Sequence, residues 1–85
     1  MKILDVRNMR TKEEREDYLK QELNFPDWYG KNLDALYDML TSYEGSILIK
    51  HSDLLKNNRI EQGTILYRLL QDAQEENEEL ILYFL

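Results

Sequence analysis

Apolar residues gather in three short runs along this chain, near its start, its middle and its end. Residues 3–6 are apolar except for Asp5, residues 46–50 are mostly apolar, and residues 80–85 are apolar without interruption. Runs of this length predict strands. A run without polar interruption is typical of a strand covered on both faces, which we expect of residues 80–85.

Three longer segments between these runs carry apolar residues at helical spacing. Thr11 followed by Glu14 is a capping-box pattern, which predicts a helix over residues 12–23. Its Glu, Lys and Arg side chains should face outward, and its inward residues should be Tyr18, Leu19 and Leu23. Asn24 accepts a left-handed stop and Pro26 prevents the helix from continuing.

Asn32 predicts the N-cap of a second helix over residues 33–43. A short capped helical turn is expected over residues 52–56, and a further helix over residues 63–77, whose Leu66, Leu69, Leu70 and Ala73 share one face. The predicted order is therefore β-α-α-β-(α)-α-β.

This order predicts the α/β class: one small domain over residues 1–85, with a three-stranded parallel sheet and helices packed on it. Strands separated by helical crossovers lie parallel, with right-handed connections. The chain has no internal repeat, linker or low-complexity segment, which argues against a second domain.

Charge narrows the expected partners. Seventeen acidic residues against eleven Lys and Arg give a net charge of −6. The phosphates of nucleic acid repel such a surface, so we expect no direct nucleic-acid binding and a cationic protein as partner.

Other features of the sequence argue against a membrane segment, a metal site and a phosphate-binding site. There is no cysteine, and the longest apolar run has only six residues, so we expect a soluble cytoplasmic protein with no membrane segment. His51 is the only histidine, and the three glycines form no phosphate-binding motif. We therefore expect no metal, no cofactor and no enzymatic activity.

The helix over residues 33–43 is unusual on its polar side. Asp34, Asp38 and Thr41 form one strip beside its apolar face, and Ser42 continues it. Two like charges four residues apart repel, whereas an ordinary exposed helix face carries pairs that attract. The short side chains would let another molecule approach closely. These acids could also have no role in binding. The helix dipole favours an acid in the first turn, where Asp34 lies, and Asp38 could simply be solvated.

The preceding turn places Trp28 and Tyr29 beside Gly30, and aromatic residues ringed by charge are typical of binding hot spots. A second acidic concentration covers residues 72–79. Its last four acids are interpreted as a solvated helix end, while Asp72 lies nearer the helix body and is a candidate for function.

The run from Phe25 to Thr41 resembles the signature of the barstar family, the intracellular inhibitors of barnase-type ribonucleases. The resemblance implies a parallel three-stranded sheet and an inhibitory surface in the region 28–43. It implies that Asp38 occupies the phosphate position of the ribonuclease active site, and that Asp34 and Asp72 also face the enzyme. The full set of expected partner-binding residues is Trp28, Tyr29, Gly30, Asn32, Asp34, Tyr37, Asp38, Thr41, Ser42, Tyr43 and Asp72.

The leading hypothesis is thus a barstar-like inhibitor, monomeric when free, that plugs the cationic active site of a ribonuclease one-to-one, without a covalent step or cofactor. One alternative is a binding module of the same fold for another basic protein. A third, less favoured hypothesis is a small enzyme that uses Asp34 and Asp38.

Overall fold

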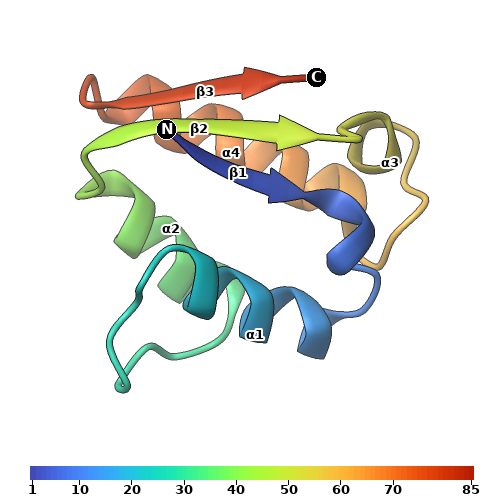
Figure 1. Ribbon diagram of the computed structural model, residues 1–85, viewed down its shortest axis with the longest axis horizontal. Coiled ribbons are helices and arrows are strands. Elements are labelled where there is room, and N and C mark those ends of the chain that lie inside the picture. The colour runs from blue at the N-terminus through green and yellow to red at the C-terminus, as the bar shows by residue number, and fades with distance from the viewer.

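Three parallel strands and the helices that connect them make up the computed structural model, which describes residues 1–85 (Figure 1). The elements follow in the order β1 (Lys2–Asp5), the 3-10 helix η1 (Val6–Asn8), α1 (Lys12–Glu22), α2 (Leu33–Thr41), β2 (Gly45–Lys50), α3 (Asp53–Lys56), α4 (Gly63–Glu76) and β3 (Leu80–Phe84). The predicted α/β class, element order and parallel sheet are confirmed. None of the helices combines the length and hydropathy that spanning a bilayer requires.

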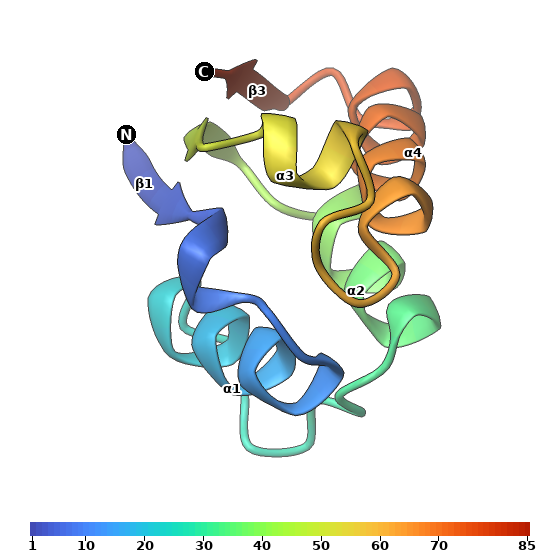
Figure 2. The ribbon, with the colours of Figure 1, turned by 90° about the vertical axis from the view of Figure 1, so that its right-hand side faces the viewer.

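The sheet has the order β1-β2-β3, with β2 at its centre and parallel pairing on both sides. The helices lie on one side of it and leave the other face bare (Figure 2). Strand order explains this arrangement. Both crossovers move in the same direction across the sheet, so connections of the same hand place their helices on the same face.

The prediction that the last strand is covered on both faces is therefore wrong. Leu80 and Leu82 of β3 are buried, but Ile81 and Tyr83 point to the bare face and are 46% and 49% exposed. Ile3 of β1, on the same face, is 54% exposed. The apolar run could not reveal this, because it contains no polar residue to mark the exposed side.

The core fills the space between the inner face of the sheet and the helices. Each fully buried Leu or Ile contributes roughly 1.5–3 kcal/mol to the free energy of unfolding. The sheet supplies Leu4, Ile47, Ile49, Leu80 and Leu82, and the helices supply Leu19, Leu36, Leu40, Leu55, Leu66, Leu70 and Ala73.

Helix α1 begins where predicted, because the Thr11 Oγ1 accepts a hydrogen bond from the Glu14 N–H at 3.1 Å. Beyond its C-terminus Asn24 adopts the left-handed conformation, with a φ of 58°. The predicted outward face of this helix needs one correction. Arg15 and Glu16 are buried, with exposed fractions of 0% and 2%.

Two other elements differ slightly from the prediction. Val6 begins η1 instead of extending the strand, because the Asp5 carboxylate accepts a hydrogen bond from the Arg7 N–H and turns the chain. Ser52 does not cap α3; its hydroxyl donates to the Leu85 carbonyl at 3.0 Å and so ties the end of the chain to the sheet.

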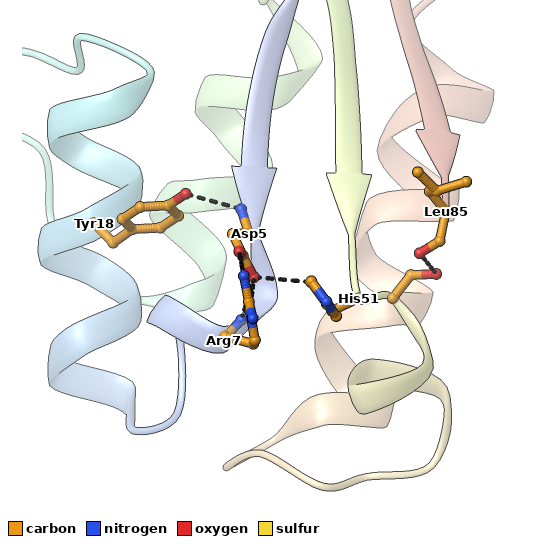
Figure 3. A network of polar contacts seen from close by, with 6 residues as sticks. Asp5, Arg7, Tyr18, His51 and Leu85 are labelled. Atoms are coloured by element: carbon orange, nitrogen blue, oxygen red, sulfur yellow. Dashed lines mark hydrogen bonds and ion pairs between the residues drawn. The ribbon is translucent and has the colours of Figure 1, made fainter.

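A polar network lies at the carboxyl end of the strands (Figure 3). The Arg7 guanidinium donates to both Asp5 carboxylate oxygens, at 2.7–3.1 Å, and the His51 Nδ1 lies 3.2 Å from the nearer oxygen. The Tyr18 hydroxyl accepts from the Asp5 N–H at 2.8 Å. Hydrogen bonding from Arg7 holds the pKa of the Asp5 carboxyl well below its usual range. The network therefore links β1, η1 and α1 with the loop after β2.

Candidate functional site

The two acids of the predicted strip, Asp34 and Asp38, lie on the side of α2 that faces α4, at an open groove between the two helices. Thr41 and Ser42 do not line it. We refer to this groove as the acidic groove. It is lined by Leu33, Asp34, Tyr37 and Asp38 from α2 and by Ile65, Arg68, Leu69 and Asp72 from α4. The structure thus brings Asp72 together with Asp34 and Asp38, although the two helices are far apart in sequence.

Neither carboxylate of the α2 strip is neutralised within the molecule. Asp34 and Asp38 are both exposed and take part in no ion pair. Asp34 also lies in the first turn of α2, where the helix dipole favours an acid. Asp38 is in the second turn and has no such structural reason for its charge. It is available to a cation from outside.

The negative potential of the groove is reflected in Tyr37, whose ring is half-buried between the helices. Partial burial raises the pKa of the Tyr37 hydroxyl, and the charges of Glu76, Asp72, Asp38 and Glu75 raise it further. Acidic side chains from both α2 and α4 therefore contribute negative potential at the Tyr37 hydroxyl.

Sequence reasoning assigned Glu75 and Glu76 to a solvated helix end, and so missed their proximity to the groove. It also missed Arg68, the one basic side chain in the groove lining, and Ile65, which is 56% exposed. Arg68 and Glu76 could have been found from their spacing. They lie four residues before and after Asp72, and residues four apart lie on the same face of a helix.

The two neighbouring aromatic residues of the loop differ greatly in their exposure to solvent. Trp28 is 78% exposed, whereas Tyr29 is 5% exposed and its ring packs against Phe25 with 4.7 Å between centroids. Burial raises the pKa of the Tyr29 hydroxyl, and its hydrogen bond to Glu16 adds to the effect. Trp28 is thus accessible to a partner, while Tyr29 belongs to the core.

Comparison with known proteins identifies the family of this chain. The family described as Barstar (barnase inhibitor) matches residues 1–85, the full length of the sequence. The chain belongs to the barstar family. It is also similar to a Bacillus subtilis (strain 168) protein named "Putative ribonuclease inhibitor YrdF", with 35% identity over 77 residues that cover 87% of this chain and 85% of that protein.

Several of the residues predicted to bind a partner in this barstar-family chain make hydrogen bonds at the two ends of α2. The Asn32 Oδ1 accepts from the Ala35 N–H at 2.7 Å and caps the helix as predicted. At the other end the Thr41 hydroxyl donates to the Asp38 carbonyl at 2.9 Å, and the Ser42 hydroxyl lies 3.4 Å from the same oxygen. The helix ends at Thr41, two residues earlier than predicted.

Gly30 is needed for close packing at the start of α2. A Cβ at this position would lie 3.2 Å from the Cβ of Ala35 and 3.4 Å from the Nδ2 of Asn32. A side chain at residue 30 would therefore make the contact between the loop and the first turn of the helix tighter than usual, and a small shift would be needed to relieve it.

Asn77, which sequence reasoning did not single out, fixes α2 relative to α4. Its side-chain amide is largely buried and donates to the carbonyls of Leu40 and Tyr43, at 2.9 and 2.8 Å. Its Oδ1 accepts from the Glu79 N–H at 3.0 Å. These bonds connect the C-terminal ends of the two helices that form the acidic groove.

Proposed function

We propose that this chain inhibits a ribonuclease by placing the acidic side of α2 in the enzyme's RNA-binding cleft, as a one-to-one, non-covalent complex. Membership of a family described as barnase inhibitors supports a ribonuclease partner. The observation that carries the finer proposal is Asp38, an exposed carboxylate without an ion-pair partner beside a groove of like charge. Such an inhibitor acts where cellular RNA lies, in the cytoplasm.

Electrostatics explains why this surface suits such a cleft. A ribonuclease binds RNA phosphates with cationic side chains, and a carboxylate in the same position accepts charge-assisted hydrogen bonds from Arg or Lys. The overall charge of −6 adds long-range attraction, which raises the rate of encounter with a basic protein.

The roles within the surface then follow from position. Asp38 mimics a substrate phosphate, while Asp34 and Asp72 meet further cations at the rim of the cleft. Trp28 provides an exposed aromatic contact next to the helix, of the kind that dominates protein interfaces. Tyr37 lines the groove and provides apolar contact there.

The test is inhibition of RNA cleavage by a barnase-type ribonuclease titrated with the parent chain and with Asp38→Ala. The variant should bind about 2–5 kcal/mol more weakly, because the cations of the enzyme are left buried and unpaired. The control is Asp53→Ala, which removes one exposed carboxylate from α3 and changes the net charge equally.

Equal inhibition by the parent and Asp38→Ala would contradict the assignment of Asp38. Tight binding to the ribonuclease without loss of RNA cleavage would contradict inhibition. Capture of a different basic protein from the native host, with no effect on any ribonuclease, would favour a binding module of the same fold.

A further inference from the structure

A buried ion pair lies at the junction between α1 and the loop that carries Trp28. Arg15 and Glu16 are adjacent in α1 and almost inaccessible to solvent. The Arg15 Nε donates to the Glu16 Oε2 at 2.6 Å. Charged residues are rarely buried, because each loses several kcal/mol of hydration that the pair must recover.

Each member of this pair also contacts a segment beyond α1. The Glu16 Oε1 accepts a hydrogen bond from the Tyr29 hydroxyl at 2.5 Å, in the loop before α2. The Arg15 Nη1 donates to the Oε1 of Gln62, the residue immediately before α4, at 3.0 Å. Gln62 has a φ of 58°, so the chain enters α4 through a left-handed residue. The pair therefore connects the entrances to both helices of the acidic groove.

We propose that Glu16 is a positioning residue for the loop of residues 25–32. It holds the Tyr29 hydroxyl and thereby fixes the neighbouring Trp28, while Arg15 connects the same carboxylate to the start of α4. The effect on the loop is independent of any partner, whereas its consequence for binding rests on the proposed function.

A purely stabilising role explains the pair less well. Replacing a buried ion pair by apolar residues of similar size is often neutral or stabilising. Here the cost of burial is increased because the Arg15 Nη2 is buried without a hydrogen-bond partner. What an apolar pair cannot provide is a directional bond to the Tyr29 hydroxyl, and that bond determines which way the loop is held.

The other polar contacts between α1 and the loop are weak alternatives. Lys31 pairs with Asp17 at 2.9 Å, and Lys20 lies 3.7 Å from Asp27. Both pairs involve exposed side chains, and such pairs contribute little to stability or geometry. The Phe25 N–H donates to the Lys20 carbonyl at 3.0 Å where the loop begins, and further along the loop the hydrogen bond between Tyr29 and Glu16 is the buried side-chain contact with the helix.

The first test uses the free protein and Tyr29→Phe, which removes one hydroxyl and keeps the ring against Phe25. Two measurements report on the loop: hydrogen exchange of the residue-29 amide, which donates to the Pro26 carbonyl, and fluorescence anisotropy of Trp28, the only tryptophan. Loss of a hydrogen bond to a charged group should speed loop exchange by about tenfold or more and lower the anisotropy.

The matched control is Tyr18→Phe. Tyr18 is a partly buried tyrosine of α1, and its hydroxyl accepts from the Asp5 N–H, away from the loop (Figure 3). This variant should leave loop exchange and Trp28 anisotropy unchanged. Exchange of the Leu48 amide in the central strand provides the reference for global unfolding, so a general loss of stability is separated from a local loosening.

A double variant, Arg15→Met with Glu16→Leu, separates positioning from stability. We expect its urea midpoint to equal or exceed that of the parent, while loop exchange becomes faster. Unchanged loop exchange in both Tyr29→Phe and the double variant overturns the inference. So does faster exchange that affects the loop and the Leu48 amide equally.

The same variants test the consequence for binding. Tyr29→Phe should weaken inhibition of the ribonuclease about as much as it loosens the loop, roughly tenfold. A looser loop with unchanged inhibition overturns the role of Glu16 in binding. Failure of the parent chain to inhibit any ribonuclease contradicts the proposed function alone, because the loop measurements need no partner.

Discussion

Replacing Asn77 by alanine should separate the C-terminal ends of α2 and α4, and with them the two walls of the acidic groove. The side chain makes three hydrogen bonds of 2.8–3.0 Å: two to carbonyls at the end of α2 and one from the Glu79 N–H. Alanine can replace none of them. The Leu40 carbonyl, whose bond to Asn77 is buried, would lose this partner.

The expected loss in free energy of unfolding is about 3 kcal/mol, since a typical hydrogen bond contributes about 1 kcal/mol. Domains of this size have a total stability of roughly 4–13 kcal/mol, so this loss is a large fraction of it. It corresponds to a decrease in melting temperature on the order of 15 °C.

Urea unfolding followed by far-UV circular dichroism measures this loss directly. The control is Asn57→Ala at the exposed end of α3, which should change stability by less than about 0.5 kcal/mol. Asn77→Asp should be at least as destabilising as Asn77→Ala, because it places a carboxylate oxygen against two carbonyls.

A loss below about 1 kcal/mol for Asn77→Ala, or an equal loss for Asn57→Ala, would refute this reasoning. Either result would mean that water replaces the side-chain amide at the helix ends. The groove would then be fixed by apolar packing between the helices alone.

Three further predictions concern acid stability, packing and association. The lowered pKa of Asp5 contributes stability above about pH 4, and this contribution is lost as the pH falls. The difference in stability between the parent and Asp5→Asn should therefore shrink below about pH 4 in urea titrations. A constant difference would contradict the pairing with Arg7. Gly30→Ala should lower the free energy of unfolding in urea by about 1 kcal/mol, because the added Cβ meets the Cβ of Ala35. The same substitution should cost less in an Ala35→Gly background, and the absence of coupling in this double-mutant cycle would refute the close contact. Raising the salt concentration should slow association with the ribonuclease in stopped-flow measurements, and a salt-independent rate would argue against electrostatic steering.

The parts of the fold that depend on neighbouring residues were predictable. Thr11 and Asn32 start their helices as expected, and the left-handed Asn24 follows the end of α1. These features depend on contacts within a few residues, so their pattern is visible in the sequence. The parallel sheet was also predictable, because strands joined by helices can pair in few ways.

The candidate site was predictable in part. The spacing of Asp34 and Asp38 placed them on one strip of α2, and that strip faces the groove. Arg68, which lines the groove, and Glu76, whose charge acts on Tyr37, were not assigned to the site. Their positions depend on which face of α4 packs beside α2, which is a property of the tertiary structure.

By itself the sequence determined the elements, their order, the net negative charge and the acidic strip, since each depends on local spacing or composition. Only the tertiary structure decided which of the charged and aromatic residues are buried. Trp28 and Tyr29 are adjacent aromatics, yet one is exposed and the other lies in the core. Arg15 and Glu16 were assigned to the outward, polar face of their helix, yet both are buried. They pair with each other, and Tyr29 and Gln62, 13 and 47 residues away in the sequence, provide further hydrogen bonds. Burial of a polar group is set by such distant partners, and no local pattern contains them.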